Sequence, residues 1–393
     1  MLEWLIVGGG VQGSYLSNVV VHALGAAPER VRVLDPHPRP LEAWRRRARN
    51  CAMDFLRSPG VHHIDVDPFS LLRFARSQAA PPTAELWGRY QHPSLCLFEA
   101  HAGAVIERAG LEALRTPGEL RRLRACEGGY RAETTYGELR ARRVLLAVGP
   151  PRELNWPAWA RAAREGGAPV AHLFDEQAPL AQLAPHERVL VVGSGCTAAH
   201  AALHAARIAR STTWLTRTAL RGAEYDSEPG WLGPKFLRDF ERERAPQRRR
   251  AAIDTARQPG TLPARLQHAV ALALRHERLS HELGDEPRVE LDASGRAWVR
   301  GLAAADGERF DRVVLATGFA RVRPAGGWLD ELADELGLER APCGYPVLAP
   351  TLEWAPGLYV TGQLAELELG PTARNIGGAR LAAERLVLGR SAA

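Results

Sequence analysis

Three glycines, Gly8, Gly10 and Gly13, form a Gly-x-Gly-x-x-Gly loop directly after an apolar run at residues 4–7. In a strand–loop–helix unit, the first glycine permits a tight turn, the second lets the backbone approach a pyrophosphate, and the third lets the helix pack on the strand. The phosphates then lie at the helix N-terminus, which favours negative charge. We expect that helix at residues 14–23. The loop alone is weak evidence, because similar turns occur without a ligand.

An acidic side chain stands where the ribose of such a ligand would lie. A second apolar run, residues 31–34, ends in Asp35 and Pro36, about 20 residues beyond the loop, and this is the distance expected of a ribose-binding carboxylate. The sequence therefore predicts a dinucleotide site in the first part of the chain. Its expected residues are Gly8, Gly10, Val11, Gln12, Gly13, Asp35 and Pro36.

The same arrangement recurs in the second half of the chain. Residues 188–192 indicate a strand, residues 193–198 form a Gly-x-Gly-x-x-Ala loop, and residues 200–210 indicate a helix. Each unit closes on a buried strand with an Ala-x-Gly exit, which ends at Gly149 in the first unit and at Gly318 in the second. This internal repeat predicts two dinucleotide sites. The second would use Gly193, Gly195, Cys196 and Thr197.

The two units differ at the ribose position. The first has Asp35, which suits an unmodified ribose, whereas the second has Thr216 and Arg217 and lacks an acidic residue. An arginine at this position accommodates a 2′-phosphate. The sequence therefore predicts FAD in the first site and NADPH in the second. Arginines are abundant in this stretch, so NADH stays open as the alternative.

The C-terminal segment is predicted to return to the first site. Residues 357–363 indicate a strand that ends in a glycine turn, and residues 370–388 indicate a helix with Pro371 at its first position. The N-terminus of that helix would stabilise negative charge on the pyrimidine side of a reduced flavin. The alternative is an ordinary helix that docks on the sheet. The expected cofactor residues in this segment are Gly362, Gln363, Pro371 and Thr372.

Length and composition indicate a globular protein of two or three domains, with 393 residues, 46% hydrophobic and 24% charged. No apolar run approaches the roughly 18 residues of a membrane span. The N-terminus enters a strand almost at once, so we expect no signal peptide and a cytoplasmic location. The net charge of +6 does not predict nucleic-acid binding, because the dense basic run at residues 242–250 lacks a stacking motif and indicates a solvated helix face.

Cysteines, histidines and the single lysine give weaker signals. The five cysteines contain no Cys-x-x-Cys pair, so neither a zinc site nor a redox-active disulfide is predicted. His62 and His63 stand near acidic residues, but adjacent side chains on an extended segment point in opposite directions, which disfavours a shared metal. Lys235 is the only lysine, which indicates either a need for a compact ammonium group or chance retention.

Taken together, both glycine loops, Asp35, the Ala-x-Gly exits and Gly362 before a final helix resemble the two-dinucleotide-binding flavoproteins. The resemblance covers most of the chain. It implies an α/β fold of two Rossmann-like, three-layer domains. An FAD domain would comprise residues 1–155 and 320–393. An NAD(P)H domain would be inserted at residues 156–319, with a helical insertion at about 225–285.

The middle of the chain resembles the lysine and ornithine N-monooxygenases. Met53, Leu56 and Arg57, followed by residues 67–74, are similar to a family segment that lines the flavin and the substrate. In this resemblance Arg57 takes the place of a lysine that binds the substrate carboxylate. Asp54 is the residue nearest to a flavin-proximal glutamine. The family's asparagines are absent around residues 230–236, and its Asn-Tyr signature is replaced by Pro-Gly-Thr at 259–261.

This resemblance implies an FAD-dependent, NADPH-consuming monooxygenase. It would transfer oxygen from a C4a-hydroperoxyflavin to a nucleophilic nitrogen or sulfur centre of a small molecule, with O₂ as co-substrate and no metal. Asp54, Arg57 and Lys235 are the candidate catalytic residues. An NAD(P)H-dependent reductase and a non-catalytic FAD/NADP-binding sensor stay open as alternatives. The substrate and the oligomeric state also stay open, although relatives of this kind often form dimers or tetramers.

Overall fold

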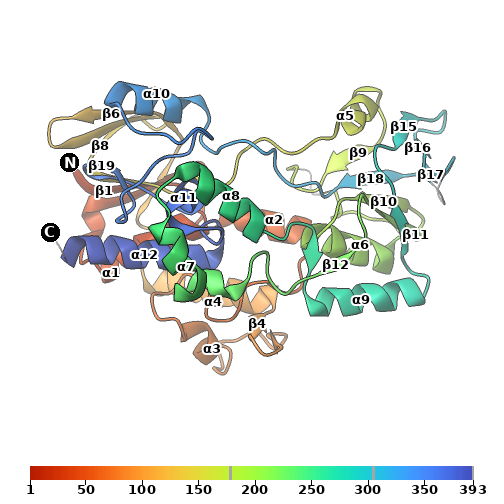
Figure 1. Cartoon of the computed structure of the whole chain (residues 1–393). Coiled ribbons are helices and arrows are strands. Elements are labelled where there is room, and N and C mark those ends of the chain that lie inside the picture. Colours follow the sequence, from red (N-terminus) through yellow and green to blue (C-terminus); the bar gives the residue numbers. More distant parts are fainter. Residues whose placement is uncertain (177–178, 303–305, 392–393) are drawn as a thin grey trace.

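The computed structural model describes residues 1–176, 179–302 and 306–391. Two β-sheets stand side by side, each with helices on its faces (Figure 1). The first has parallel pairings throughout its centre and an antiparallel edge. Its order is β19 (Glu353–Ala355), β20 (Leu358–Val360), β8 (Glu138–Leu146), β1 (Leu2–Val7), β2 (Val31–Asp35) and β5 (Arg115–Pro117), with the hairpin β6 (Leu120–Cys126) and β7 (Gly129–Thr134) paired to β8.

Both faces of the first sheet are buried, as the continuous apolar run in β1 requires. Trp4 and Ile6 face one core, and Leu5 and Val7 face another, because successive side chains point to opposite faces of a strand. The first core is covered by α1 (Val11–His22), α4 (Leu95–Arg108) and α12 (Ile376–Ser391), and the second by α10 (Gly327–Leu336) and the β6–β7 hairpin.

The second sheet is wholly parallel, and it repeats this plan. Its order is β14 (Ser280–Leu283), β11 (Ser211–Thr216), β10 (Arg188–Val192), β18 (Arg312–Leu315) and β9 (Val170–His172). One face is covered by α6 (Cys196–Ile208) and α9 (Ala264–Arg275), and the other by α5 (Ala158–Glu165) and the antiparallel strands β15 (Arg288–Leu291), β16 (Ala297–Arg300) and β17 (Arg309–Phe310). The prediction of three-layer α/β units is confirmed.

Two segments cross between the sheets and pair with each other. Asn155 N–H donates to the Gly318 carbonyl at 2.9 Å, and Ala320 N–H donates to the Glu153 carbonyl at 2.9 Å. Leu154 and Phe319 form an isolated antiparallel bridge between these hydrogen bonds. We propose the domain boundaries here, at residues 155 and 320. Residues 177–178, 303–305 and 392–393 of the proposed domains lie outside the described residues.

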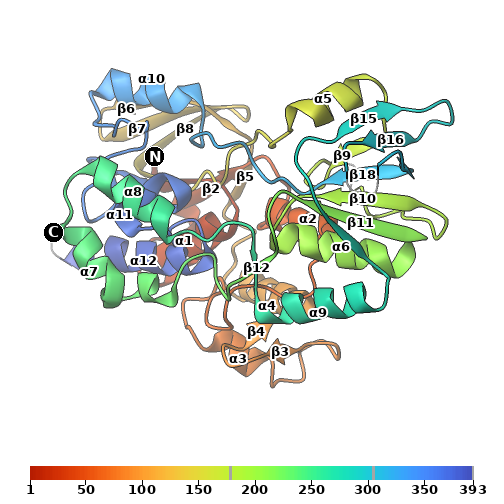
Figure 2. The same ribbon diagram turned by 45° about the vertical axis from the view of Figure 1, so that its right-hand side comes forward.

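The segment at 225–285 is helical, but it serves both halves of the molecule. It contains η2 (Pro229–Leu232), α7 (Pro234–Arg242), α8 (Pro246–Ala256) and α9. Figures 1 and 2 show α7 and α8 beside α11 (Glu366–Leu369) and α12, whereas α9 lies on the second sheet. Phe240 of α7 and Ile253 of α8 share a small core with Tyr345 and Leu367. This placement puts the insertion across the gap between the two sheets.

The prediction of a solvated face at residues 242–250 is wrong in part. Arg249 forms an ion pair with Glu368, and Arg250 forms one with Glu366, and all four side chains are largely buried. Composition alone cannot show that a neighbouring helix, α11, brings carboxylates against an arginine-rich face.

The start of the C-terminal helix was also predicted wrongly. Gly370, with φ +77°, ends α11, and α12 begins only at Ile376, so Pro371 is not at its first position. The intervening turn is held from outside, because the Gln12 side-chain amide donates to the carbonyls of Ala373 at 3.1 Å and Asn375 at 2.9 Å.

Short elements complete the chain. Residues 51–85 are largely irregular and contain the short helix α3 (Ser70–Phe74). Within the described ranges, no helix is long and apolar enough to cross a membrane. The remaining elements are η1 (Pro28–Arg30), α2 (Glu42–Asn50), β3 (Leu86–Trp87), β4 (His92–Pro93), β12 (Arg221–Gly222), β13 (Thr261–Leu262) and η3 (Gly362–Ala365).

Candidate functional site: one cavity between two glycine loops

The first glycine loop has no room for side chains at two of its glycines. Gly8 has φ +109°, and a Cβ there would collide with the carbonyl oxygen of Ala147 on the exit of β8. A Cβ on Gly13 would collide with the Gly8 carbonyl, so α1 packs directly on the loop. Gly10 has open space where its Cβ would stand, and it lines a cavity. This backbone fits the close approach of a phosphate group.

The second glycine loop is built in the same way. Gly193 has φ +136°, and a Cβ there would stand 2.5 Å from the carbonyl oxygen of Ala316 on the exit of β18. Gly195 has φ +106°, and its Cβ would stand 3.3 Å from Gly260. In both loops the first glycine therefore rests on the carbonyl of the alanine that begins the Ala-x-Gly turn, although the two loops lie far apart in the sequence.

Both loops open into one cavity of about 1700 Å³. Typical small-molecule sites hold roughly 300–1,000 Å³, so this volume exceeds what a single ligand of that size requires. The predicted cofactor residues that line it are Gly8, Gly10, Val11, Gln12, Asp35, Pro36, Gly149, Gly195, Cys196, Thr197, Gly318 and Thr372. Among the described residues, those that the cavity lining does not include are Gly13, Gly193, Arg217, Gly362, Gln363 and Pro371.

Asp35 ends β2 and is already hydrogen-bonded to the glycine loop. Its Oδ2 accepts from Gly9 N–H at 2.6 Å, and its Oδ1 accepts from His37 N–H at 2.9 Å. The His37 ring Nδ1 lies 3.0 Å from the same oxygen, and Arg115 Nη2 lies 3.7 Å from it. The carboxylate is thus fixed at the cavity wall, where it could accept the hydroxyls of a ribose.

Gln12 connects the first loop to the C-terminal turn. Besides its two donations to Ala373 and Asn375, its Oε1 accepts from Thr361 Oγ1 at 3.0 Å. Gly362 packs on this side chain, whereas the Gln363 amide donates to the Tyr345 hydroxyl at 3.0 Å. Neither predicted residue lines the cavity: Gly362 supports it through Gln12, and Gln363 is bonded to Tyr345 instead.

Strand register shows which residue of the second unit occupies the position equivalent to Asp35. Val7 pairs with Leu34 and Val192 pairs with Leu215, so Thr216 occupies the position of Asp35. The Thr216 Oγ1 lies 2.8 Å from His281 Nε2. Arg217 follows as an exposed residue at the end of β11, next to the loop but outside the cavity lining.

Asp54 lies outside this cavity as well. Its carboxylate lies 3.0 Å from Arg265 Nη1 and 3.2 Å from His200 Nδ1, beside a separate pocket of about 50 Å³. Burial lowers the pKa of His200 to about 4, so the imidazole is neutral near pH 7. Asp54 therefore joins the first half of the chain to helices α6 and α9 of the second.

Arg57 lines the cavity, but its guanidinium is held by main-chain carbonyls. Its Nε donates to the Glu224 carbonyl at 2.9 Å, and its Nη2 donates to the Ala223 carbonyl at 2.8 Å and to Thr261 Oγ1 at 2.9 Å. These acceptors come from the second half of the chain. The geometry favours an interdomain contact over a group that is free to bind a carboxylate.

Lys235 stands on the surface. Its side chain is 69% exposed, and its Nζ lies 3.9 Å from Glu228 and 4.7 Å from the centre of the Phe236 ring. It is not among the residues that line either pocket described above. These contacts give the single lysine no position from which to act on a ligand in the cavity.

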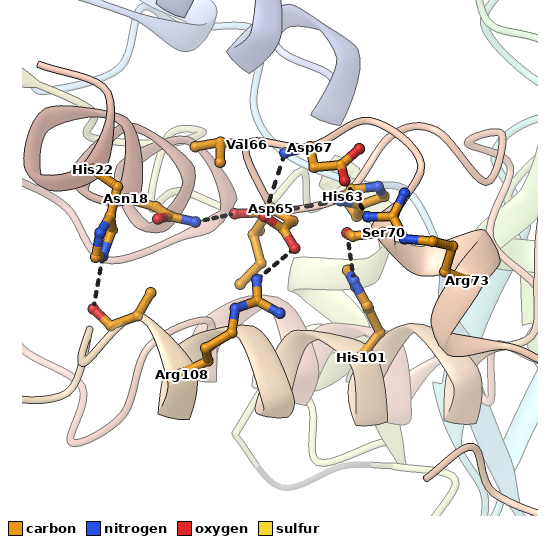
Figure 3. Close-up of polar contacts among 12 residues, drawn as sticks. Asn18, His22, His63, Asp65, Val66, Asp67, Ser70, Arg73, His101 and Arg108 are labelled. Atoms are coloured by element: carbon orange, nitrogen blue, oxygen red, sulfur yellow. Dashed lines mark hydrogen bonds and ion pairs between the residues drawn. The ribbon is translucent and has the colours of Figure 1, made fainter. Parts of the chain in front are cut away.

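His63 belongs to a buried polar cluster beside α4 (Figure 3). Its Nδ1 accepts from Asp65 N–H at 3.2 Å, and its ring lies 4.7 Å from that of His101. Burial, reinforced by His101, lowers the pKa of His63 to about 3, so both rings share the core as neutral groups. His101 Nε2 lies 2.8 Å from Ser70 Oγ, and Arg108 Nη2 donates to Asp65 Oδ2 at 2.6 Å.

Metal ligation is not supported anywhere in the part of the chain that the structure describes, where no group of three or more His, Cys, Asp or Glu residues could hold an ion. All five cysteines are free thiols.

Several residues in or beside the cavity were missed by the sequence analysis. Arg115 does not line the cavity, but it reaches Asp35 from β5, and nothing in the sequence pairs these positions. Arg374 and Asn375 lie in the segment that was predicted to begin the C-terminal helix and to approach the flavin. That prediction was the one sequence signal that could have indicated these two residues. The other side chains of this kind are Trp44, Arg47, His62, Tyr90, Tyr225 and Asp226.

Comparisons with known proteins agree with this geometry. Residues 5–151 match a family model described as FAD-NAD(P)-binding, which confirms the dinucleotide-binding prediction for the first glycine loop. No curated protein matches the sequence.

Solved structures of three monooxygenases are among those that resemble the whole chain. The FAD-bound cadaverine monooxygenase DfoA from Erwinia amylovora is 16% identical, with a TM-score of 0.69 over 99% of this chain and 94% of the other. The reduced ornithine hydroxylase PvdA from Pseudomonas aeruginosa is also 16% identical, with a TM-score of 0.69 over 99% and 98%. The L-lysine 6-monooxygenase from Pseudomonas syringae is 16% identical, with a TM-score of 0.68 over 100% and 99%. Likeness at this identity is a likeness of fold, and it confirms the predicted architecture.

Proposed function

We propose that this chain is an FAD-dependent, NADPH-consuming monooxygenase that oxygenates a nucleophilic nitrogen or sulfur centre of a small molecule. The observation that carries the proposal is the continuous cavity shared by the two glycine loops. Hydride transfer requires the nicotinamide and flavin rings to approach to roughly 3–3.5 Å. Dinucleotides bound at the two loops have a common space in which their ring ends could meet.

The residues of the first half would hold FAD. Gly8, Gly10 and Gly13 provide the phosphate cradle at the start of α1, and Asp35 provides acceptors for the ribose hydroxyls. When bound, the flavin would supply the electron transfer and oxygen activation, while the protein provides binding, orientation and a shielded site.

The residues of the second half would hold NADPH. Gly193 and Gly195 repeat the cradle, and Arg217 stands exposed directly after β11, where its guanidinium could bind a 2′-phosphate. One oxygen atom of O₂ would go to the substrate, and the other would be reduced to water by the two electrons of NADPH with uptake of one proton from solvent, which leaves NADP⁺.

Amines are the first substrates to test, because the structures with the same fold act on cadaverine, ornithine and lysine by their names. FAD-loaded protein is reduced anaerobically with NADPH and mixed with O₂ in a stopped-flow spectrometer, with and without each of these three amines. We expect a transient absorbance distinct from both oxidised and reduced flavin. We also expect a hydroxylated product from at least one of the three amines.

Other outcomes of this experiment contradict the proposal. Direct return to oxidised flavin without a transient species would support the NAD(P)H-dependent reductase instead. Failure of both NADPH and NADH to reduce the bound flavin would support a non-catalytic sensor.

A further inference from the structure

One arginine of the cavity wall forms an ion pair with a carboxylate that also pairs with two other arginines. Arg374 lines the cavity, and its Nη2 donates to Glu366 Oε2 at 2.8 Å. Glu366 is fully buried, with 0% of its side chain exposed, and it also pairs with Arg250 of α8 and with Arg257, which directly follows α8. Three guanidinium groups therefore converge on one carboxylate, and the positive charge around Glu366 exceeds the negative charge.

Neighbouring carboxylates do not remove this excess. Glu368 is paired with its own arginine, Arg249, from the same helix α8. Asp226 lies on the cavity side, where its Oδ1 accepts from Asn375 Nδ2 at 3.0 Å. Even if the Asp226 charge is counted in full, it offsets only part of the excess.

Buried donor groups without acceptors also indicate that a negative group is missing beside these arginines. Within the described residues, Nε of Arg257 is buried and has no hydrogen-bond acceptor, and Nε and Nη2 of Arg250 are buried without an oxygen or nitrogen acceptor, with only the weakly accepting Cys343 thiol beside that guanidinium. Burial, followed by repulsion from Arg374, lowers the pKa of Arg257. Buried cations need a compensating anion, because desolvation of an unpaired charge is costly. The arrangement is therefore short of one negative group.

Other arginines of the cavity wall are engaged differently. Arg57 donates to main-chain carbonyls and Thr261, and the Arg47 guanidinium lies 4.8 Å from the centre of the Phe319 ring. Arg152 forms an ion pair with Glu119 at 3.0 Å. Arg323 shares Asp330 with Arg340, but Arg340 also pairs with Asp334, so two carboxylates serve two arginines there. Arg374 differs because three guanidinium groups share its one carboxylate partner, and 35% of its side chain is exposed.

The position of Arg374 is fixed from three directions. Glu366 holds its guanidinium, Gln12 holds the carbonyls of the adjacent Ala373 and Asn375, and Asp226 holds the Asn375 amide. A planar guanidinium in a fixed orientation favours bidentate recognition of a planar anion such as a carboxylate.

We propose that Arg374 is the centre of an anion-binding subsite in the cavity wall, with Glu366 as its positioning residue. The subsite takes a delocalised, planar anion. That anion is either the carboxylate of a substrate or the negatively charged pyrimidine edge of the reduced flavin. The inference rests on the proposed function for the identity of the cavity, and it assigns the role that Arg57 was predicted to have to a different residue.

The test uses FAD-loaded protein and two readouts. Glutarate, and uncharged glutaramide as its matched control, are titrated by calorimetry, and the midpoint potential of the bound FAD is measured by spectroelectrochemistry. Wild-type protein is compared with Arg374→Gln and with Arg374→Lys, which retains the charge. Arg300→Gln serves as the control variant, because Arg300 forms a one-to-one ion pair with Glu290 on a surface hairpin at 2.8 Å.

A substrate-carboxylate subsite predicts that glutarate binds wild-type protein and Arg300→Gln with equal affinity. Its affinity for Arg374→Gln should be at least about tenfold lower, and its affinity for Arg374→Lys should lie between these values. Glutaramide should not bind measurably. A flavin subsite predicts instead that Arg374→Gln lowers the midpoint potential. A tenfold weaker preference for the reduced form corresponds to about 30 mV.

The inference is overturned if Arg374→Gln changes neither glutarate binding nor the potential. Calorimetry with glutarate does not require oxygenation. If glutarate binds at Arg374 but the protein forms no oxygenated product, only the proposed function is contradicted. If the protein oxygenates a substrate and Arg374→Gln changes neither glutarate binding nor the potential, only this inference is contradicted.

Discussion

The first and second glycine loops have the same backbone and different surroundings. In each, the first glycine rests on an alanine carbonyl of the neighbouring exit strand, Ala147 in one loop and Ala316 in the other. At the strand end that follows, the first unit has Asp35 held by the loop itself, whereas the second has Thr216 and the exposed Arg217. The phosphate cradle is thus a property of backbone shape, and ribose selection is a property of one or two side chains beside it.

The two loops also close against different segments. Gln12 ties the first loop to the C-terminal turn. At the equivalent position of the second loop stands Thr197, and that loop packs instead on Gly260, with Cys196 Sγ 3.5 Å from the Thr261 carbonyl. The segment at 258–261 belongs to the insertion, so each loop is completed by a part of the chain that the repeat does not contain.

Substitution of the first glycine in each loop should have the largest effect and should separate the two sites. An alanine at either position combines a strained positive φ with a collision against backbone, at a combined cost of roughly 2–4 kcal/mol. We expect Gly8→Ala to lose bound FAD. We expect Gly193→Ala to retain FAD and lose reduction by NADPH.

Flavin content after purification, thermal unfolding and anaerobic reduction measure these effects. Loss of FAD from Gly193→Ala with retention in Gly8→Ala would contradict the assignment of the two loops.

The ribose position should give the next largest effect. Loss of a charge-assisted contact of roughly 1.5–3 kcal/mol predicts that Arg217→Ala raises KM for NADPH about 10- to 100-fold and changes KM for NADH little. Steady-state NAD(P)H oxidation measures both constants. Arg221→Ala is the matched control, because Arg221 donates to the Pro259 carbonyl at 2.7 Å. Equal changes for both coenzymes would show that Arg217 does not select the 2′-phosphate.

Acid should destabilise both halves through buried neutral histidines. Burial lowers the pKa of His101 in the first half and of His172 in the second to about 4, against an ordinary value of 6.5. A base with a lowered folded-state pKa contributes stability that is fully present above pH 6.5 and is lost as the pH falls towards 4. We expect the free energy of unfolding to fall in this window, by up to about 1.4 kcal/mol per pH unit for each such histidine.

Urea denaturation between pH 7 and pH 4 measures this slope. His101→Gln should have a shallower slope than the wild type. An unchanged slope would mean that His101 is accessible to protons in the folded state.

The single lysine should have the smallest effect. Lys235 is mostly exposed, and among the described residues its ammonium group contacts Glu228 and the Phe236 ring, so Lys235→Arg should preserve unfolding stability to within about 0.5 kcal/mol. Turnover with NADPH should also stay within about twofold, which is at most roughly 0.4 kcal/mol in barrier height. A larger loss of turnover would restore the hypothesis that a compact ammonium group is required.

Local patterns predicted the parts of the site that consist of backbone. Gly8, Gly10 and Asp35 follow each other within one strand–loop–helix–strand unit, so their geometry could be derived from spacing alone. The repeat at Gly193 was found in the same way. The Ala-x-Gly exits at Gly149 and Gly318 line the cavity because parallel strands end at the same edge of each sheet.

Contacts between distant segments could not be predicted. Arg115 meets Asp35 from another strand. The contacts of Arg57 could not be foreseen either, because its acceptors are the main-chain carbonyls of residues 223 and 224 and the Thr261 hydroxyl, which have no sequence signature. Arg250 was assigned to solvent because nothing in its own helix shows that Glu366 lies opposite. Such pairings depend on how the insertion lies on the first half.

The central claim is that two dinucleotides at the two loops meet in one cavity. Anaerobic stopped-flow mixing of FAD-loaded protein with NADPH tests it most directly, with NADPH deuterated at the transferred position as the comparison. The account predicts bleaching of the flavin absorbance in a single turnover, slowed by deuterium and abolished in Gly193→Ala. Bleaching that is unaffected by Gly193→Ala, or no bleaching of a fully loaded protein, would contradict it.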